Sequence, residues 1–123
     1  MSYDIRLGVK VDGAEDLYAV IAEPYKSHPT YNVGEMLRVC TGWDFSQGEW
    51  YKVSDVIPKI KHGISELITN EERYKQYNSP NGYGSTKGAL EALDSLLTCI
   101  KDNNGDSGWS WNTIPEEHLY VCW

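Results

Sequence analysis

The sequence predicts an α+β fold: a small antiparallel sheet, made of two N-terminal strands and a C-terminal strand, packed against about three helices. Two patterns predict it. Apolar residues alternate with period two near both ends of the chain, and they follow helical spacing between them. With 123 residues, 41% of them hydrophobic, the chain is long enough to bury a core without disulfides or metal. We therefore expect residues 1–123 to form a single globular domain.

The strand predictions come from three short segments. Residues 5–11 place an apolar side chain at every second position, which is typical of a half-buried strand. Residues 17–22 are uniformly apolar or aromatic, and the Asp-Gly pair at 12–13 favours a turn, so the two segments form an antiparallel hairpin. Residues 119–123 alternate again and predict a third strand.

The first two helices are predicted from caps and from apolar spacing. Residues 33–41 carry apolar side chains at i, i+3, i+4 and i+7, with Asn32 as the N-cap and Gly42 as the stop. A second helix begins at a cap formed by Ser54 or Asp55, and its apolar stripe continues for four turns.

The remaining segments are one more helix and the connections. Residues 42–53 read as an aromatic and acidic connection, and 71–77 either continue the second helix or form a short polar one. Residues 78–85 carry the strongest loop signal in the chain, being rich in Asn, Pro, Gly and Ser. Ser85 or Thr86 then caps the helix with the most complete apolar stripe.

The aromatic residues give the main functional signal. The chain has nine Tyr and five Trp but a single Phe. Tyr and Trp are favoured where one edge of the ring is apolar and the other meets water, a ligand or a partner. Several of them fall in or near predicted loops, beside acidic residues. The candidate partner-binding residues are Trp43, Asp44, Glu49, Trp50, Tyr51, Trp109 and Trp111.

Two interpretations of the segment from Trp43 to Tyr51 stay open. In the first, its aromatic residues anchor a partner and the carboxylates of Asp44 and Glu49 face a basic surface. In the second, the aromatic residues fold inward as a lid over the core. A small hydrolase that uses Asp44, Glu49 or a histidine is a weaker alternative.

Charge and cysteine content narrow the function classes. The net charge is −7 and no basic stripe is evident, which disfavours direct nucleic-acid binding and favours a partner with a basic surface. Acidity that only keeps the protein in solution is the alternative. We expect neither a membrane span nor a signal peptide, and hence a cytoplasmic protein. The three cysteines are far apart and predict buried thiols, without a disulfide framework, metal or other cofactor.

One loop is a candidate for a small anion. Residues 81–87 lead from a Gly-rich stretch into the start of a helix, where unpaired backbone N–H groups and the helix dipole favour negative charge. Tyr83, Ser85 and Lys87 are the candidate contacts for a nucleotide ligand. An ordinary Gly-rich loop with a helix cap is the alternative, since the P-loop pattern is absent.

Several segments together resemble a known group of proteins. These are the opening residues 1–5, the stretch 29–32 before a short helix, and the helical segments 57–67 and 88–93 separated by a polar loop. They resemble small proteins encoded by bacteriophages and integrative elements of Gram-positive bacteria. The resemblance implies a mobile-element accessory protein in the cytoplasm of a bacterial host, and it carries over no functional residue.

The function that we expect is therefore binding without catalysis. An accessory protein of this kind would bind and inhibit a host protein, such as a defence protein, through its acidic, Tyr- and Trp-rich loops. Two alternatives stay open. One is a small-molecule binder that sequesters a nucleotide signal. The other is a self-assembling structural protein, a homo-oligomer that associates through Trp109, Trp111 and the C-terminal strand.

Overall fold

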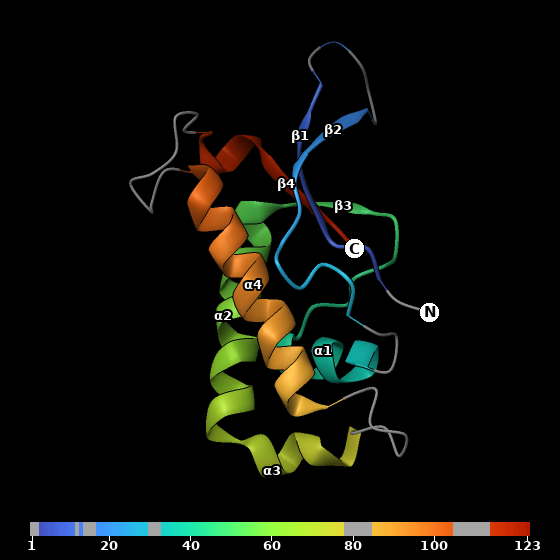
Figure 1. Cartoon of the computed structure of the whole chain (residues 1–123), viewed down its shortest axis with the longest axis vertical. Coiled ribbons are helices and arrows are strands. Elements are labelled where there is room, and N and C mark those ends of the chain that lie inside the picture. The colour runs from blue at the N-terminus through green and yellow to red at the C-terminus, as the bar shows by residue number, and fades with distance from the viewer. Residues whose placement is uncertain (1–2, 12, 14–16, 30–32, 78–84, 105–113) are drawn as a thin grey trace.

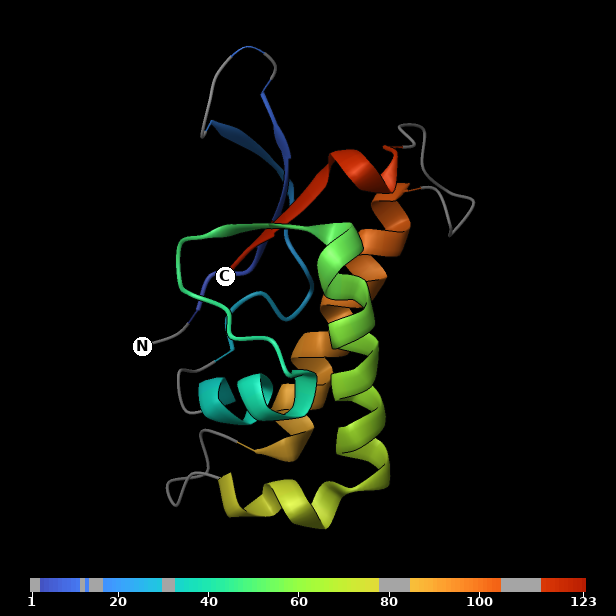
Figure 2. The same cartoon turned by 180° about the vertical axis from the view of Figure 1, so that it is seen from behind.

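The computed structural model describes residues 3–11, 13, 17–29, 33–77, 85–104 and 114–123. Strands and helices stand side by side, with the helices on one side of the sheet (Figures 1 and 2). The elements in chain order are β1 (Arg6–Lys10), β2 (Tyr18–Ala22), α1 (Gly34–Thr41), β3 (Trp50–Lys52), α2 (Val53–Thr69), α3 (Glu71–Tyr74), the 3-10 turn η2 (Lys75–Tyr77), α4 (Thr86–Asn104), the 3-10 turn η3 (Glu116–His118) and β4 (Leu119–Cys122).

The sheet confirms the α+β prediction and extends it by one strand. Its four strands run in the order β2-β1-β4-β3, and every neighbouring pair is antiparallel. The two N-terminal strands and the C-terminal strand are present as predicted. The fourth strand, β3, lies in the segment 42–53 that the sequence predicted as a connection. β3 has only three residues, which is too short for an alternating pattern to be recognised.

The position of β4 bears on one alternative. Self-association through the C-terminal strand would be favoured by an exposed edge, but β4 pairs with β1 on one side and with β3 on the other. Its backbone groups are therefore used within the chain. The two outer positions of the sheet belong to β2 and β3 instead.

The strand register determines which side chains enter the core. Leu7 lies opposite Val121, and Val121 lies opposite Tyr51, so these three side chains share one face of the sheet. Leu7 and Val121 are fully buried and Tyr51 packs against the same core. This inner face is covered by the helices, and we refer to the opposite one as the outer face.

The helix layer packs closely around one glycine. Gly63, in the middle of α2, has no side chain, and a Cβ there would lie 2.6 Å from the Thr41 side chain of α1 and 2.9 Å from that of Leu93 of α4. Both distances are shorter than atoms tolerate, so a glycine at this point allows the three helices to approach one another. Burial of the apolar stripes is the main force that holds this layer together.

The helix ends follow the predicted caps in two places and depart from them in one. Gly42 ends α1 in the left-handed conformation with φ of 68°, and the side chain of Ser85 accepts a hydrogen bond from the Gly88 amide at 3.1 Å at the start of α4. Helix α2 begins earlier than predicted, at Val53, and no side chain caps it. It continues directly from β3, which replaces the expected loop. The predicted cap Asn32 lies outside the described residues.

The polar segment 71–77 forms a short turn of its own. Helix α2 ends at Asn70, whose backbone leaves the helical region with ψ of 36°. The chain then forms α3 and the 3-10 turn η2. Tyr74 is 1% exposed and anchors this turn in the core. In the described part of the chain, no helix combines the length and apolar character that crossing a bilayer requires.

Candidate functional site

The outer face of the sheet carries a cluster of three aromatic rings. Trp50 of β3 stacks on Tyr18 of β2, with ring centroids 4.8 Å apart and planes 11° apart, and Tyr120 of β4 meets Tyr18 edge-on at 5.0 Å. The three residues are half-buried, so part of each ring remains accessible. We refer to Tyr18, Trp50 and Tyr120 as the outer aromatic cluster.

Gly8 of β1 makes this cluster possible. A Cβ at Gly8 would lie 2.7 Å from the Trp50 ring and 2.8 Å from the carbonyl oxygen of Ala19. Because Gly8 has no side chain, the Trp50 ring reaches from one edge strand across the sheet to Tyr18 on the other. The stack fixes the Trp50 rotamer through contacts with both the backbone and a second ring.

The outer face is locally basic although the chain is acidic. Arg6 and Lys10 lie on the same side of β1 as Gly8, and Lys52 of β3 shares this face because it lies opposite Tyr120. Arg6 has a weak ion pair with Asp4 at 3.7 Å. Lys10 and Lys52 have no ion pair with any described residue.

A shallow groove lies beside the stacked pair. It has a volume of about 450 Å³ and is lined by Tyr18, Gly48, Glu49 and Trp50. Gly48 takes a φ of 85° there, a conformation that favours glycine, and its amide donates to the carbonyl oxygen of Trp123 at 2.9 Å. The groove therefore lies beside two aromatic residues, is lined mainly by polar atoms and includes one exposed carboxylate, that of Glu49.

Within the segment from Trp43 to Tyr51, some residues fit the lid interpretation and others fit the partner-binding interpretation. Trp43 is 4% exposed and packs into the core against Phe45 and Trp123, as the lid interpretation expects. The Asp44 side chain points fully into solvent, with Arg38 3.9 Å away, and Glu49 is also exposed.

The two aromatic residues at the end of this segment face opposite ways. Tyr51 lies on the inner side, where its hydroxyl accepts a hydrogen bond from the Ser46 amide at 2.7 Å and its ring meets Trp43 edge-on. Trp50 lies on the outer face. Of the aromatic residues in this segment, only Trp50 is placed with its ring on the outer face.

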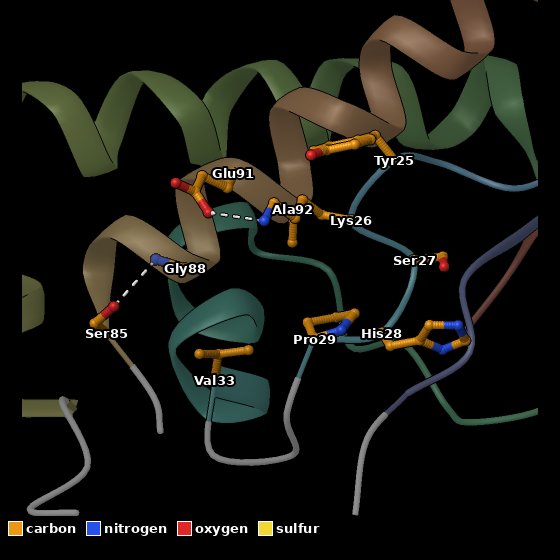
Figure 3. A pocket seen from close by; sticks show the side chains of 10 residues that line it. All are labelled: Tyr25, Lys26, Ser27, His28, Pro29, Val33, Ser85, Gly88, Glu91 and Ala92. Atoms are coloured by element: carbon orange, nitrogen blue, oxygen red, sulfur yellow. Dashed lines mark hydrogen bonds and ion pairs between the residues drawn. The ribbon is translucent and has the colours of Figure 1, made fainter. Parts of the chain in front are cut away.

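A second candidate is a cavity of about 430 Å³ between the start of α4 and the segment that leads from β2 to α1. Figure 3 shows its lining. Ser85, Gly88 and Glu91 come from α4, and Tyr25 and Lys26 face them from the other wall. Tyr25 is 89% exposed and Lys26 lies 3.9 Å from the Glu91 carboxylate.

The cavity coincides only in part with the predicted anion loop. Ser85 lines it, but its hydroxyl already caps α4. Lys87 is exposed and is absent from the lining. Tyr83 lies outside the described residues, as do Trp109 and Trp111.

The nucleophile and metal candidates are kept apart in the described part of the chain. The three histidines are exposed, with His28 2.8 Å from Asp4 and His62 3.7 Å from Glu66. Among the described residues, no group of three His, Cys, Asp or Glu side chains is arranged to hold a metal ion. The cysteines are buried, as predicted, and the surrounding apolar atoms disfavour the charged thiolate.

Sequence reasoning found Trp50 but missed the residues around it. Tyr18 and Tyr120 were assigned to strands without a functional role, and Gly8 was read only as a polar or small position. For Tyr120 and Gly8 the signal available was alternation with core residues, which places them on the far side of their strands, whereas the uniformly apolar segment that contains Tyr18 carries no such signal. Comparison of the chain with protein-family models, with curated proteins and with solved structures gives no match.

The thiols of this protein are expected to be unreactive in the folded state. Burial raises the pKa of Cys40 from its usual 9.0 to about 12 and that of Cys99 to about 11, and it also raises the pKa of Cys122. At about pH 8 the neutral thiol therefore dominates, and a disulfide reagent should react roughly a hundredfold or more slowly than with the urea-unfolded chain.

Unfolding should release all three thiols of the sequence. An Ile68→Cys variant is the matched control, because Ile68 is 62% exposed and its replacement should react at the rate of a free thiol. Rapid reaction of one native cysteine in the unmodified protein would contradict the assignment.

Proposed function

We propose that this chain is a non-enzymatic binding protein that docks on another protein with the outer face of its sheet and inhibits it. The observation that carries the proposal is the outer aromatic cluster, in which Trp50 is stacked on Tyr18 beside a groove on the face away from the helices. Large aromatic side chains that are held in place and remain partly accessible are the residues that dominate the energetics of many interfaces.

Preorganisation supports Trp50 as the anchor. The ring is already packed against Gly8 and Tyr18, so little side-chain freedom remains to be lost on binding. A flexible, solvated tryptophan would lose more conformational entropy in the same contact. The accessible part of the ring offers a partner apolar area, and the groove next to it, which is lined mainly by polar atoms, offers the Glu49 carboxylate.

The charges on the outer face favour an acidic contact surface on the partner. Net charge led to the expectation of a basic partner, but Arg6, Lys10 and Lys52 surround the cluster, and Glu49 is the acid among the groove residues. Opposite charges across an interface speed association and determine its orientation. Asp44 projects elsewhere from the segment and remains the candidate for a basic contact.

The class of partner follows from the resemblance to mobile-element proteins. It makes a bacterial host protein, and a defence protein in particular, the first class to test. Inhibition would follow from occupying a surface that the host protein needs, and this requires no chemistry from the chain itself.

Truncation of the Trp50 side chain should abolish capture of the partner protein. A Trp50→Ala variant used as bait in host lysate should lose any true partner, because truncating an anchor residue typically costs about 2 kcal/mol or more, or roughly thirtyfold in affinity. Tyr25→Ala is the matched control, since it removes an exposed ring from the other candidate site. Mass spectrometry compares the captures. If the Trp50→Ala and Tyr25→Ala variants are both folded and capture the same proteins, the assignment of the outer face as the docking surface is refuted.

Reversing single charges beside Trp50 shows whether the contact surface of the partner is acidic or basic. For a partner with an acidic contact surface, Lys52→Glu should weaken binding severalfold and Glu49→Lys should leave it equal or stronger. A basic contact surface gives the opposite order. The two substitutions lie on either side of Trp50, so each is the control for the other, and titration calorimetry with the purified partner measures both. Equal effects of the two substitutions would place the interface elsewhere.

A second candidate function is binding of a small phosphorylated ligand, such as a nucleotide, in the cavity at the start of α4. The observation that favours it is the meeting of a helix N-terminus, Lys26 and the exposed Tyr25 ring around about 430 Å³. Glu91 opposes an anion there, because its carboxylate is 3.9 Å from the Lys26 ammonium. For this reason we rank it below docking.

Calorimetry with mono- and cyclic nucleotides tests the cavity. A real site should release or absorb heat at millimolar ligand, and Lys26→Ala should weaken binding about tenfold, since one cation–phosphate contact is removed. Lys87→Ala is the control variant, because Lys87 lies between the lining residues Ser85 and Gly88 in sequence but does not itself line the cavity. Absence of heat with every nucleotide, or equal loss in both variants, would remove this candidate.

A further inference from the structure

The strand β2 leaves an apolar edge of the sheet exposed. It occupies an end position in the strand order, and no described strand pairs with its outer side. Three of its apolar side chains are unusually accessible, with Leu17 just before the strand 53% exposed, Val20 49% and Ile21 38%. Residues 17–22 contain no charged residue and no proline, two of the devices with which proteins protect such an edge, although a bulge at Ile21 interrupts the regular pairing with β1.

The hydrogen bonds to β1 show which backbone groups of this edge are available. The amide of Val11 donates to the carbonyl oxygen of Leu17 at 2.9 Å, so Leu17 directs its backbone groups toward β1. Direction alternates along an antiparallel strand, and therefore Ala19 also faces β1 while Tyr18 and Val20 face outward. The N–H and C=O groups of these two residues form the free edge.

We propose that this edge pairs with the same strand of a second copy of the chain, joining two four-stranded sheets into one antiparallel sheet of eight strands. The two-fold axis passes through Ala19, which then faces Ala19 of the second copy. In this register Tyr18 exchanges both backbone hydrogen bonds with Val20 of the other chain. Ile21 takes no part in the regular pairing, because the bulge of β2 lies at this residue.

Self-complementarity favours a second copy over an unrelated strand. Val20 gains an aromatic partner and Tyr18 an apolar one in this register, and residues 17–21 contain no charged residue that could meet another. Registers shifted by one residue would bring side chains from opposite faces together. A shift by two residues would place Leu17 opposite the charged Glu23.

The interface is narrow, so dimerisation should depend on concentration. One strand pair and three apolar contacts bury less surface than a stable obligate dimer requires. The proposal does not rest on the docking function, because its hydrogen bonds come from the backbone edge of β2, although the side chains of Tyr18 and Val20 lie on the outer face. It does place both outer aromatic clusters on the same face of the joined sheet.

Light scattering after gel filtration, over a concentration series up to the millimolar range, tests the dimer. The mass of the unmodified protein should rise from one chain toward two, and Val20→Lys should shift the midpoint at least tenfold higher in concentration. Ile68→Lys is the matched control, because it changes an exposed apolar residue on α2, away from the edge, and should dimerise like the unmodified protein. A constant one-chain mass, or equal effects of both substitutions, would overturn the proposal.

A cysteine at the two-fold axis tests the register independently of the stability of the Val20 variant. The facing Ala19 residues form a non-hydrogen-bonded pair, in which Cα atoms are about 4.5 Å apart and a disulfide is geometrically allowed. With a mild oxidant, Ala19→Cys should give a covalent dimer, whereas Ile68→Cys, equally able to react, should not. Failure of Ala19→Cys to cross-link at concentrations that give the dimer mass would refute this strand pairing.

Discussion

The pairing of β4 with both β1 and β3 is the interaction on which the rest of the structure depends. The β1–β2 hairpin gains its second row of hydrogen bonds only through β4. The residue after β4, Trp123, is 2% exposed and stacks on Phe45 with ring centroids 4.4 Å apart. Both ends of the described chain therefore meet in one core, and the register of a single central strand determines the two faces of the sheet.

Burial of Trp123 in this arrangement carries a free-energy penalty. Its indole Nε1 is buried without a hydrogen-bond partner among the described residues, a penalty of about 1–3 kcal/mol. Burial of the large ring against Phe45, Trp43 and Tyr3 offsets that penalty. The pairing of β4 with its two neighbours places Trp123 in the core.

Most of the fold could be predicted from periodicity, whereas the candidate site could not. Apolar spacing located α1, α2 and α4, and alternation located β1 and β4, because each pattern lies within one continuous segment. The outer aromatic cluster takes one residue from each of three strands and depends on the missing side chain of Gly8. Such a cluster is determined by cross-strand register, which the sequence of one strand does not contain.

The net charge of the chain does not describe the outer face, for the same reason. A value of −7 describes the whole surface, but Arg6 and Lys10 share a face because Gly8 and two core positions separate them in an alternating strand. Lys52 joins them through β4, which lies between β1 and β3. The local field that a partner meets is therefore determined by strand pairing rather than by composition.

Tyr18 links the two surfaces of this protein physically. Its ring belongs to the outer aromatic cluster, while its backbone N–H and C=O lie on the free edge of β2. Pairing of two edges would hold two copies of the cluster on one continuous face, so that a partner with two binding sites would gain affinity through effective concentration without any new contact. Val20 lies opposite Gly8, so its side chain shares the outer face with the cluster, whereas Trp50 lies on β3, at the other edge of the sheet. A change at Trp50 therefore leaves the edge of β2 in place, and a change at Val20 acts on both surfaces.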